Sequence, residues 1–171
     1  MRKIITLLTD FGLRDHYAGV MKGVILGINP DAVIVDITHE IRSYHIYEAA
    51  FKLRSCYSYF PEGTIHVAVV DPGVGGPRRP LAAEAGGYYF VGPDNGIFSA
   101  VFESAGNPSV VEITRTEFML DNISTTFHGR DIFAPVAAHL SNGVSVLDHG
   151  ITDPNPVSLD VPRPTAKGGE I

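Results

Sequence analysis

Residues 71–79 have the composition of a loop that binds a small charged ligand. They read Asp-Pro-Gly-Val-Gly-Gly-Pro-Arg-Arg and directly follow the apolar run 65–70. Asp71 supplies a carboxylate and Arg78 or Arg79 supplies a fixed positive charge, while the glycines let the backbone come close to a ligand. In α/β proteins, ligands bind beyond the carboxyl ends of parallel strands. The pattern therefore predicts a ligand site at this loop.

Three other polar clusters stand at the ends of predicted strands or at the start of a predicted helix. They are Thr9-Asp10-Phe11-Gly12 with Asp15, Thr38-His39-Glu40, and Thr125-Thr126-Phe127-His128-Gly129-Arg130-Asp131. The first two follow the first two predicted strands, so we expect them to share one crevice with residues 71–79. Structural roles remain open for several members. Asp15 also suits a helix N-cap, an N-cap is the favoured role of Asp131, and His128 also suits a buried core histidine.

Apolar runs and helical periodicity predict the elements that position these clusters. Strands are expected at 4–9, 32–37 and 65–70, and helices at 17–29 and 46–59 alternate with them. This order favours an α/β fold with a largely parallel central sheet flanked by helices on both faces. The second half of the chain predicts a hairpin around Gly86-Gly87, a short helix at 96–104, a strand at 109–113 and a helix at 131–140.

The composition limits the class of protein. The 171-residue chain has a formal charge of −6, which disfavours nucleic-acid binding. The single cysteine, Cys56, excludes an internal disulfide and is expected to be packed and inert. The apolar start of the chain is too short for a signal peptide, and no segment approaches a membrane span. We therefore expect a cytoplasmic protein, with one α/β domain over 1–150 and a Pro-rich linker over 151–171.

Several common catalytic templates are absent from the sequence. It has no phosphate-binding P-loop, no Gly-x-Gly-x-x-Gly turn after the first strand and no Gly-x-Ser-x-Gly nucleophile elbow. The histidines lack the spacing of a helical zinc pair, and there is no cysteine cluster. One metal-dependent alternative stays open, a hydrolase site built from Asp10, His39, Asp71 and His128.

Five ordered motifs together resemble a known family. They are Thr9-Asp10-Phe11-Gly12 with Asp15-x-Tyr17-x-Gly19-x-x-Lys22-Gly23, Asp36-x-Thr38-His39, Asp71-Pro72-Gly73-Val74-Gly75, Gly92-Pro93-Asp94-Asn95-Gly96, and Phe127-His128-Gly129-Arg130-Asp131-Ile132-Phe133-Ala134-Pro135. From residue 4 to about residue 165 the chain resembles the S-adenosyl-L-methionine hydroxide adenosyltransferases. These enzymes are the water-using relatives of the fluorinating and chlorinating enzymes that act on the same substrate.

The resemblance implies that water or hydroxide attacks C5′ of S-adenosylmethionine, giving adenosine and methionine. The family's catalytic Asp–Arg–His triad falls on Asp71, Arg78 and His128. Its ribose-binding aspartate falls on Asp10 and its methionine-contacting aspartate on Asp15. Phe11, Thr38, His39, Asp94 and Asn95 complete the predicted substrate-binding set, and no metal or cofactor is expected. The resemblance also implies a homotrimer with the ligand between subunits, and a C-terminal β-rich domain that would begin where this chain ends.

The chemistry of the triad suggests a division of labour. Asp71 is expected to position the water, and the permanently charged Arg78 to stabilise developing hydroxide. The ordinary pKa of an imidazole lies near 6.5, so His128 is expected to accept or relay the proton. Two other functions remain open. One is a non-catalytic module that binds S-adenosylmethionine or adenosine, and the other is a halogenase, which Asp71 disfavours because a carboxylate repels halide.

Overall fold

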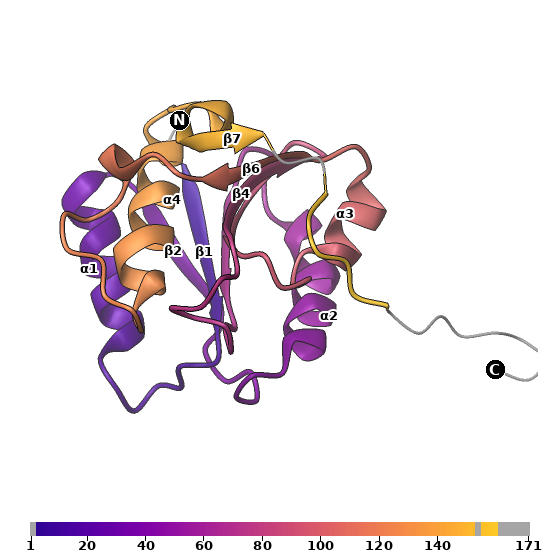
Figure 1. The fold of residues 1–171 in the computed structure, drawn as a ribbon, viewed down its shortest axis with the longest axis horizontal. Helices are drawn as coiled ribbons and strands as arrows, with labels where there is room; N and C mark the ends of the chain where they lie inside the picture. Colours follow the sequence, from indigo (N-terminus) through magenta and orange to yellow (C-terminus); the bar gives the residue numbers. More distant parts are fainter. Residues whose placement is uncertain (1–2, 153–154, 161–171) are drawn as a thin grey trace, which may run out of the picture.

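A seven-stranded sheet forms the centre of the molecule in the computed structural model, which describes residues 3–152 and 155–160 (Figure 1). Its spatial order is β2-β1-β3-β5-β4-β6-β7. The strands are β1 (Ile4–Thr9), β2 (Val33–Thr38), β3 (Ile65–Val69), β4 (Pro80–Ala85), β5 (Tyr88–Pro93), β6 (Ser109–Ile113) and β7 (Gly150–Thr152). The first four strands in the spatial order are parallel, and antiparallel pairing begins at β4. The predicted α/β fold with a largely parallel sheet and a hairpin is confirmed.

Helices cover both faces of this sheet, as the side view of Figure 1 shows. They are α1 (Tyr17–Ile28), α2 (Ile46–Cys56), α3 (Ser99–Ala105) and α4 (Ala134–Ser141). α1 and α4 lie on one face, and α2 and α3 lie on the other. α1 buries Ala18, Met21 and Ile25, which recur at helical spacing. No helix in the described part of the chain has the length and apolar character to cross a membrane.

β3 shows why the strands are almost continuously apolar. Ile65, Val67 and Val69 belong to the core beneath α1 and α4, whereas Ala68, and Val70 just after the strand, belong to the core beneath α2 and α3. Side chains alternate between the two faces of a strand, so a strand covered on both faces must be apolar at nearly every position. This double cover makes the central strands a rigid base for the loops that leave their carboxyl ends.

Two predicted boundaries are corrected by the structure. The helix expected at 131–140 begins later, because a π-helical turn over Gly129–Phe133 precedes α4 and Pro135 stands in the first turn of α4. The sheet also continues to Thr152, since β7 pairs antiparallel with β6, and so extends two residues into the segment predicted as a linker. Residues 153–154 and 161–171 of that segment lie outside the described residues.

Residues 155–159, here called the strap, lie against the domain. Asp94 accepts a hydrogen bond from the Val157 N–H (2.7 Å), and Ser99 accepts one from the Leu159 N–H (2.8 Å). Arg79 adds a bond from its guanidinium to the carbonyl of Asn155 (3.1 Å). The strap is therefore held mainly through its backbone, on the side of the sheet that carries α3.

Candidate active site

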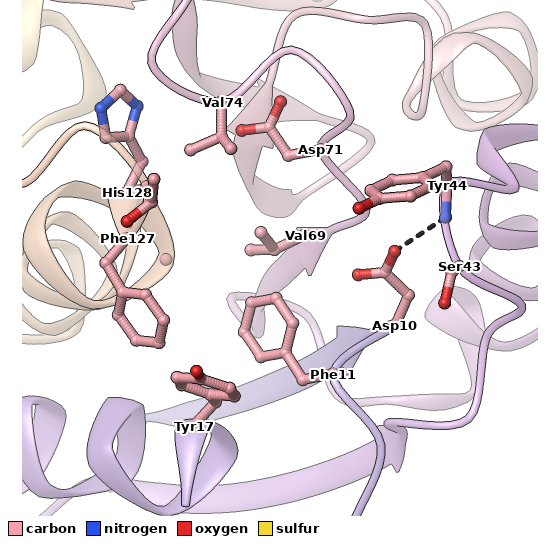
Figure 2. A pocket seen from close by; sticks show the side chains of 12 residues that line it. Asp10, Phe11, Tyr17, Ser43, Tyr44, Val69, Asp71, Val74, Phe127 and His128 are labelled. Carbon is pink, nitrogen blue, oxygen red and sulfur yellow. Dashed lines mark hydrogen bonds between the residues drawn. The ribbon is translucent and has the colours of Figure 1, made fainter. Parts of the chain in front are cut away.

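The connections around β1 and β3 create a crevice at their carboxyl ends. From the carboxyl end of β1 the chain runs toward β2 on one side, and from the carboxyl end of β3 it runs toward β4 and β5 on the other side. The connections therefore leave the two neighbouring strands in opposite directions. Ligands of open α/β sheets bind at such a switch point. A cavity of about 380 Å³ lies there, with the carboxylates of Asp10 and Asp71 in its lining (Figure 2).

The three residues predicted as a catalytic triad form a hydrogen-bonded chain at this cavity. Arg78 Nε donates to both carboxylate oxygens of Asp71, at 3.0 and 2.9 Å, and Arg78 Nη2 pairs with the same carboxylate. Arg78 Nη2 also lies 2.7 Å from Nδ1 of His128. Asp71 and His128 line the cavity directly, and the Arg78 side chain is largely buried behind them. The guanidinium carbon lies 5.3 Å from the ring centre of Phe133.

A close approach of two loops makes this chain possible. Gly75 lies in the 71–79 loop with φ +74°, and a Cβ built there would come 2.1 Å from the carbonyl oxygen of Thr125. A side chain at this position would push the loop before the π-helical turn away from the loop after β3. The glycine in the motif 71–75 thus lets Arg78 on one loop reach His128 on the other.

Arg78 determines the protonation state in which His128 fits this arrangement. A guanidinium has only N–H donors, so Nδ1 of His128 must accept the hydrogen bond and carry no proton. The neutral ring then carries its proton on Nε2 and has no free lone pair. The pKa of His128 is lowered from 6.5 by burial and by the charge of Arg78, against the opposing charges of Asp71 and Asp131. His128 is therefore held neutral, which suits a group that orients Arg78.

Asp10 faces the cavity from the end of β1. Its Oδ2 accepts a hydrogen bond from the Tyr44 N–H (2.9 Å), drawn as a dashed line in Figure 2. Tyr44 adopts the left-handed conformation, with φ +65°, which few residues other than glycine take. Burial raises the pKa of Asp10, and the nearby charge of Asp71 raises it further against the Tyr44 hydrogen bond. Tyr44 carries no distinctive sequence signal and was not among the predicted site residues.

Aromatic rings form the wall opposite the two carboxylates. The ring centres of Phe127 and Tyr17 are 4.6 Å apart, and Phe11 lies 6.1 Å from Tyr17 and 6.4 Å from Phe127. Figure 2 shows the three rings gathered on one side of the cavity. Phe11 was predicted as a substrate-binding residue, and Tyr17 and Phe127 lay within the quoted motifs. The cavity therefore combines negative charge with an apolar surface.

Asp131 does not cap a helix, contrary to the role favoured from sequence. It is wholly buried within the π-helical turn, and its carboxylate pairs with Arg130 (Nε–Oδ1 2.5 Å). The same carboxylate accepts a hydrogen bond from the Ser124 N–H (2.8 Å). Asp131 thus bonds to the segment that precedes His128.

The remaining predicted residues lie outside the cavity lining. His39 is buried, with Nδ1 2.8 Å from Thr9 Oγ1 and Nε2 3.0 Å from Asp36 Oδ1, and Thr38 Oγ1 accepts from the Glu40 N–H. Asp15 is exposed in the loop before α1, whose N-cap is His16. Their role in substrate binding stays a prediction.

The motif at 92–96 makes contacts within the protein. Asp94 pairs with Arg79 and holds the strap, whereas Asn95 donates to the Val70 carbonyl (2.8 Å) and accepts from the Ile97 N–H. Neither residue is in the cavity lining, and their predicted role in substrate binding is likewise untested. These contacts also show that Arg78, and not Arg79, is the arginine bonded to the cavity residues Asp71 and His128.

The alternative metal site is not assembled by the fold. Among residues 3–152 and 155–160, no three histidine, cysteine, aspartate or glutamate side chains come together as metal ligands. The ring of His39 is engaged by Thr9 and Asp36, so it does not join Asp10, Asp71 and His128. Cys56 is half-buried at the end of α2, and burial raises the pKa of its thiol.

Fold and cavity together define an α/β protein with a small-molecule site at the switch point of a parallel sheet. Comparison with known proteins gives the family. Residues 5–150 match the model of the SAM hydroxide adenosyltransferase N-terminal domain. The chain belongs to this family, as its five motifs indicated.

Named relatives agree with this assignment. The chain is 46% identical over 142 residues to an (R)-S-adenosyl-L-methionine hydrolase of Methanocaldococcus jannaschii, covering 80% of this chain and 52% of that protein. It is 40% identical over 169 residues to one of Salinispora tropica, covering 96% of this chain and 64% of that protein. A fluorinase of Actinoplanes is 25% identical over 193 residues, covering 98% and 65% respectively. The chain thus spans about half to two thirds of the length of these curated relatives.

A solved structure confirms the fold. The crystal structure of an uncharacterized conserved protein from Thermotoga maritima superposes with a TM-score of 0.93 at 42% identity. It matches 95% of this chain, which corresponds to 63% of the Thermotoga chain. The similarity therefore extends over nearly all of the sequence described above.

Proposed function

We propose that this chain carries the catalytic site of an S-adenosylmethionine hydrolase, which forms adenosine and methionine. The observation that carries the proposal is the Asp71–Arg78–His128 chain at a cavity with Asp10 in its lining. The names of relatives at 38–46% identity support the same substrate. Cleavage by attack at C5′ fits the charges and surfaces of this cavity.

The cavity suits a sulfonium substrate in two ways. Asp10 and Asp71 place negative charge where a cation would enter, which favours its approach. The Tyr44 N–H donates one hydrogen bond to Oδ2 of Asp10. The carboxylate can therefore still accept hydrogen bonds from the two hydroxyls of a ribose. The rings of Phe11, Tyr17 and Phe127 supply an apolar wall for the rest of the ligand. Asp10 is thereby assigned to ribose binding and Phe11 to the wall.

Asp71 and Arg78 are assigned to the attacking water. Asp71 accepts a hydrogen bond from the water and orients its oxygen toward C5′. The oxygen–C5′ bond forms as the C5′–sulfur bond breaks, and the bonding electron pair stays on sulfur as methionine leaves. The proton passes from the water to the Asp71 carboxylate and then to solvent. Arg78 stabilises the developing hydroxide character through its fixed charge.

His128 is assigned the role of orienting Arg78. This role replaces the proton-accepting role that was expected from the ordinary pKa of an imidazole. The one acceptor nitrogen of the neutral ring, Nδ1, already accepts a hydrogen bond from Arg78. A base would have to break that bond before taking a proton. Activation of water thus rests on the carboxylate and guanidinium, with imidazole as the fixed support.

Product analysis tests the proposal. The chain and an Asp71→Ala variant are incubated with S-adenosylmethionine and chloride, and nucleosides are resolved by chromatography. We expect adenosine from the wild type and at least about 100-fold less from the variant. 5′-Chloro-5′-deoxyadenosine would transfer the assignment to the halogenases. Binding of S-adenosylmethionine by calorimetry without any product would favour the binding-module alternative, and absence of both would overturn the proposal.

Assembly is a separate part of the proposal. The resemblance to the family implies a homotrimer with the substrate between subunits. Light scattering of the chain with and without S-adenosylmethionine tests this, and a monomer at all concentrations with bound substrate would contradict it. The cytoplasmic location stays a prediction from the composition.

A further inference from the structure

We propose that the ion pair of Arg130 and Asp131 is a positioning device that fixes residues 124–128 and so places His128 against Arg78 and Phe127 against the cavity. The expected effect on kcat/KM rests on the proposed function, whereas the placement of His128 and Phe127 rests on the geometry alone. Neither residue lines the cavity, so both act through their neighbours.

Asp131 holds the incoming chain at two points. Its backbone carbonyl accepts from the Leu120 N–H (2.9 Å), and its carboxylate accepts from the Ser124 N–H (2.8 Å). The segment between Ser124 and Asp131 therefore begins and ends at the same buried side chain. Residues 126–129, which contribute to the cavity lining, lie inside this closed loop.

Arg130 connects the same carboxylate to the aromatic wall. Its Nε and Nη2 donate to the two oxygens of Asp131 at 2.5 and 3.0 Å. Its guanidinium carbon lies 4.9 Å from the ring centre of Phe127, in the geometry of a cation–π contact. One ion pair thus restrains Ser124 through a backbone bond and Phe127 through its ring, on either side of Thr125 and Thr126.

The π-helical turn brings the adjacent residues Arg130 and Asp131 to the start of the turn, where both can hold residues 124–128. The N–H groups of Arg130 and Asp131 both donate to the carbonyl of Phe127, at 3.1 and 3.0 Å, as the chain enters the turn. Turns of this class are frequent at functional sites. His128 immediately precedes this turn, so its ring direction depends on where the turn begins. A charge buried without its partner is costly, so loss of Arg130 is expected to move this segment.

The resonance of the His128 ring tests the placement without any substrate. The His128 ring signal is assigned by comparison with His128→Asn and followed by NMR from neutral to acid pH in wild type, Arg130→Met and Asp131→Asn. The charged groups that act on His128 are Arg78, Asp71 and Asp131. We expect a changed chemical shift in both variants. Asp131→Asn is also expected to lower the pKa of His128, because the charge of Asp131 raises it.

A matched control removes a different arginine. Arg115 pairs with Glu117 at 3.7 Å on the surface, where both side chains are more than half exposed. Arg115→Met therefore removes an ion pair that does not touch the 124–128 segment, and we expect an unchanged His128 resonance. Circular dichroism is used to check that each variant compared is folded. If Asp131→Asn does not fold, Arg130→Met decides, because the Arg130 side chain is partly exposed.

Kinetics measure the functional consequence. We expect kcat/KM for S-adenosylmethionine to fall about tenfold or more in Arg130→Met, with a higher KM from the displaced Phe127 wall, and to stay within about twofold in Arg115→Met. A folded Arg130→Met with a wild-type His128 resonance and wild-type kinetic constants would overturn the inference. If the wild type makes no adenosine, the proposed function fails, and the resonance alone still decides the positioning role.

Discussion

At the scale of single residues, the two consecutive arginines show how partners define a site. Arg78 bonds Asp71 and His128 at the cavity, whereas Arg79 pairs with Asp94 and reaches the strap. The sequence offers two identical side chains side by side and does not distinguish them. The folded structure distinguishes them by the carboxylate beside each one, Asp71 for Arg78 and Asp94 for Arg79.

The bond from Arg78 to His128 Nδ1 predicts the pH dependence of activity. Burial and the charge of Arg78 lower the pKa of His128 below 6.5, so the neutral ring persists as the pH falls through 6.5. Protonation of Nδ1 at still lower pH breaks the bond and releases Arg78. We expect the rate of adenosine formation at saturating substrate to be flat from pH 8 through 6.5 and to fall only below that.

His128→Asn separates an orienting role from a base. The asparagine side-chain oxygen stands near the position of Nδ1 and accepts a hydrogen bond without titrating. We expect this variant to keep activity within about tenfold of the wild type, whereas loss of a general base costs about 100-fold or more. A loss of activity of about 100-fold in His128→Asn would restore His128 as the proton acceptor. So would a wild-type pH–rate profile whose midpoint lies above pH 6.5.

Residue types were therefore more predictable than residue roles. The motifs identified Asp10, Asp71 and His128 because a carboxylate or imidazole after a strand or before a helix is visible in the sequence. Asp131 looked like a helix cap because its position before an apolar helical pattern fits one, but its bonds to Ser124 and Arg130 depend on the folded loop. Tyr44 gave no signal because its role uses its backbone N–H.

At the scale of elements, the contact between the two site loops predicts the effect of Gly75→Ala. The added Cβ would overlap the Thr125 carbonyl, so the loops must separate and Arg78 moves away from His128. Gly143→Ala is the matched control, because Gly143 also has a positive φ but has open space around it. Both variants are expected to lose about 1–2 kcal/mol of unfolding free energy from backbone strain alone. Only Gly75→Ala should lose adenosine formation; equal activity of the two would contradict the prediction.

The strap predicts a local effect of Asp94→Ala. The substitution removes the acceptor of the Val157 N–H and the partner of Arg79, and Arg79 is partly exposed, which softens the loss. We expect the unfolding free energy to fall by about 2 kcal/mol and hydrogen exchange at 155–159 to accelerate. Glu117→Ala, which breaks the exposed pair with Arg115, is expected to cost less than about 0.5 kcal/mol. Unchanged exchange in the strap after Asp94→Ala would show that other contacts hold it.

Long elements were predictable where pattern and burial agree. β1, β3 and β5 are apolar because both of their faces are covered, and the turn at Gly86-Gly87 marks the hairpin of β4 and β5. β7 was missed because three residues carry no periodicity and its pairing depends on β6 being in place. The π-helical turn was missed because its extra residue per turn leaves no mark in an apolar helical pattern.

At the scale of the whole molecule, a buried histidine predicts loss of stability in acid. His66 is fully buried in the core beneath α2 and α3, with Nδ1 2.8 Å from Thr6 Oγ1 and its ring stacked on Phe90. Burial lowers its pKa from 6.5 to about 4. The unfolded chain therefore binds a proton at a pH where the folded protein does not, and stability falls as the pH drops from 6.5 toward 4.

The magnitude follows from the two pKa values. We expect His66 alone to lower the unfolding free energy by about 2 kcal/mol between pH 7 and pH 5. In His66→Asn this pH-dependent part should disappear, even if the variant is less stable at both pH values. A residual slope should remain from His149, His139 and His128, because burial lowers the pKa of each of them as well. Urea unfolding at the two pH values measures it. An unchanged slope in His66→Asn would contradict the assignment.

The register of β4 against β5 has a consequence for how this sequence can change. The pairing runs without interruption from Ala85 opposite Tyr88 to Pro80 opposite Pro93, and the turn at Gly86-Gly87 fixes where it begins. One residue inserted into β4, with that turn kept, would place Arg79 where Arg78 now stands. Pro80 would then stand where Arg79 now is, so no guanidinium would remain at that position to pair with Asp94 and reach the strap. β4 is therefore constrained in length more strictly than in composition, because a turn at the far end of the strand sets which arginine stands beside Asp71 and His128.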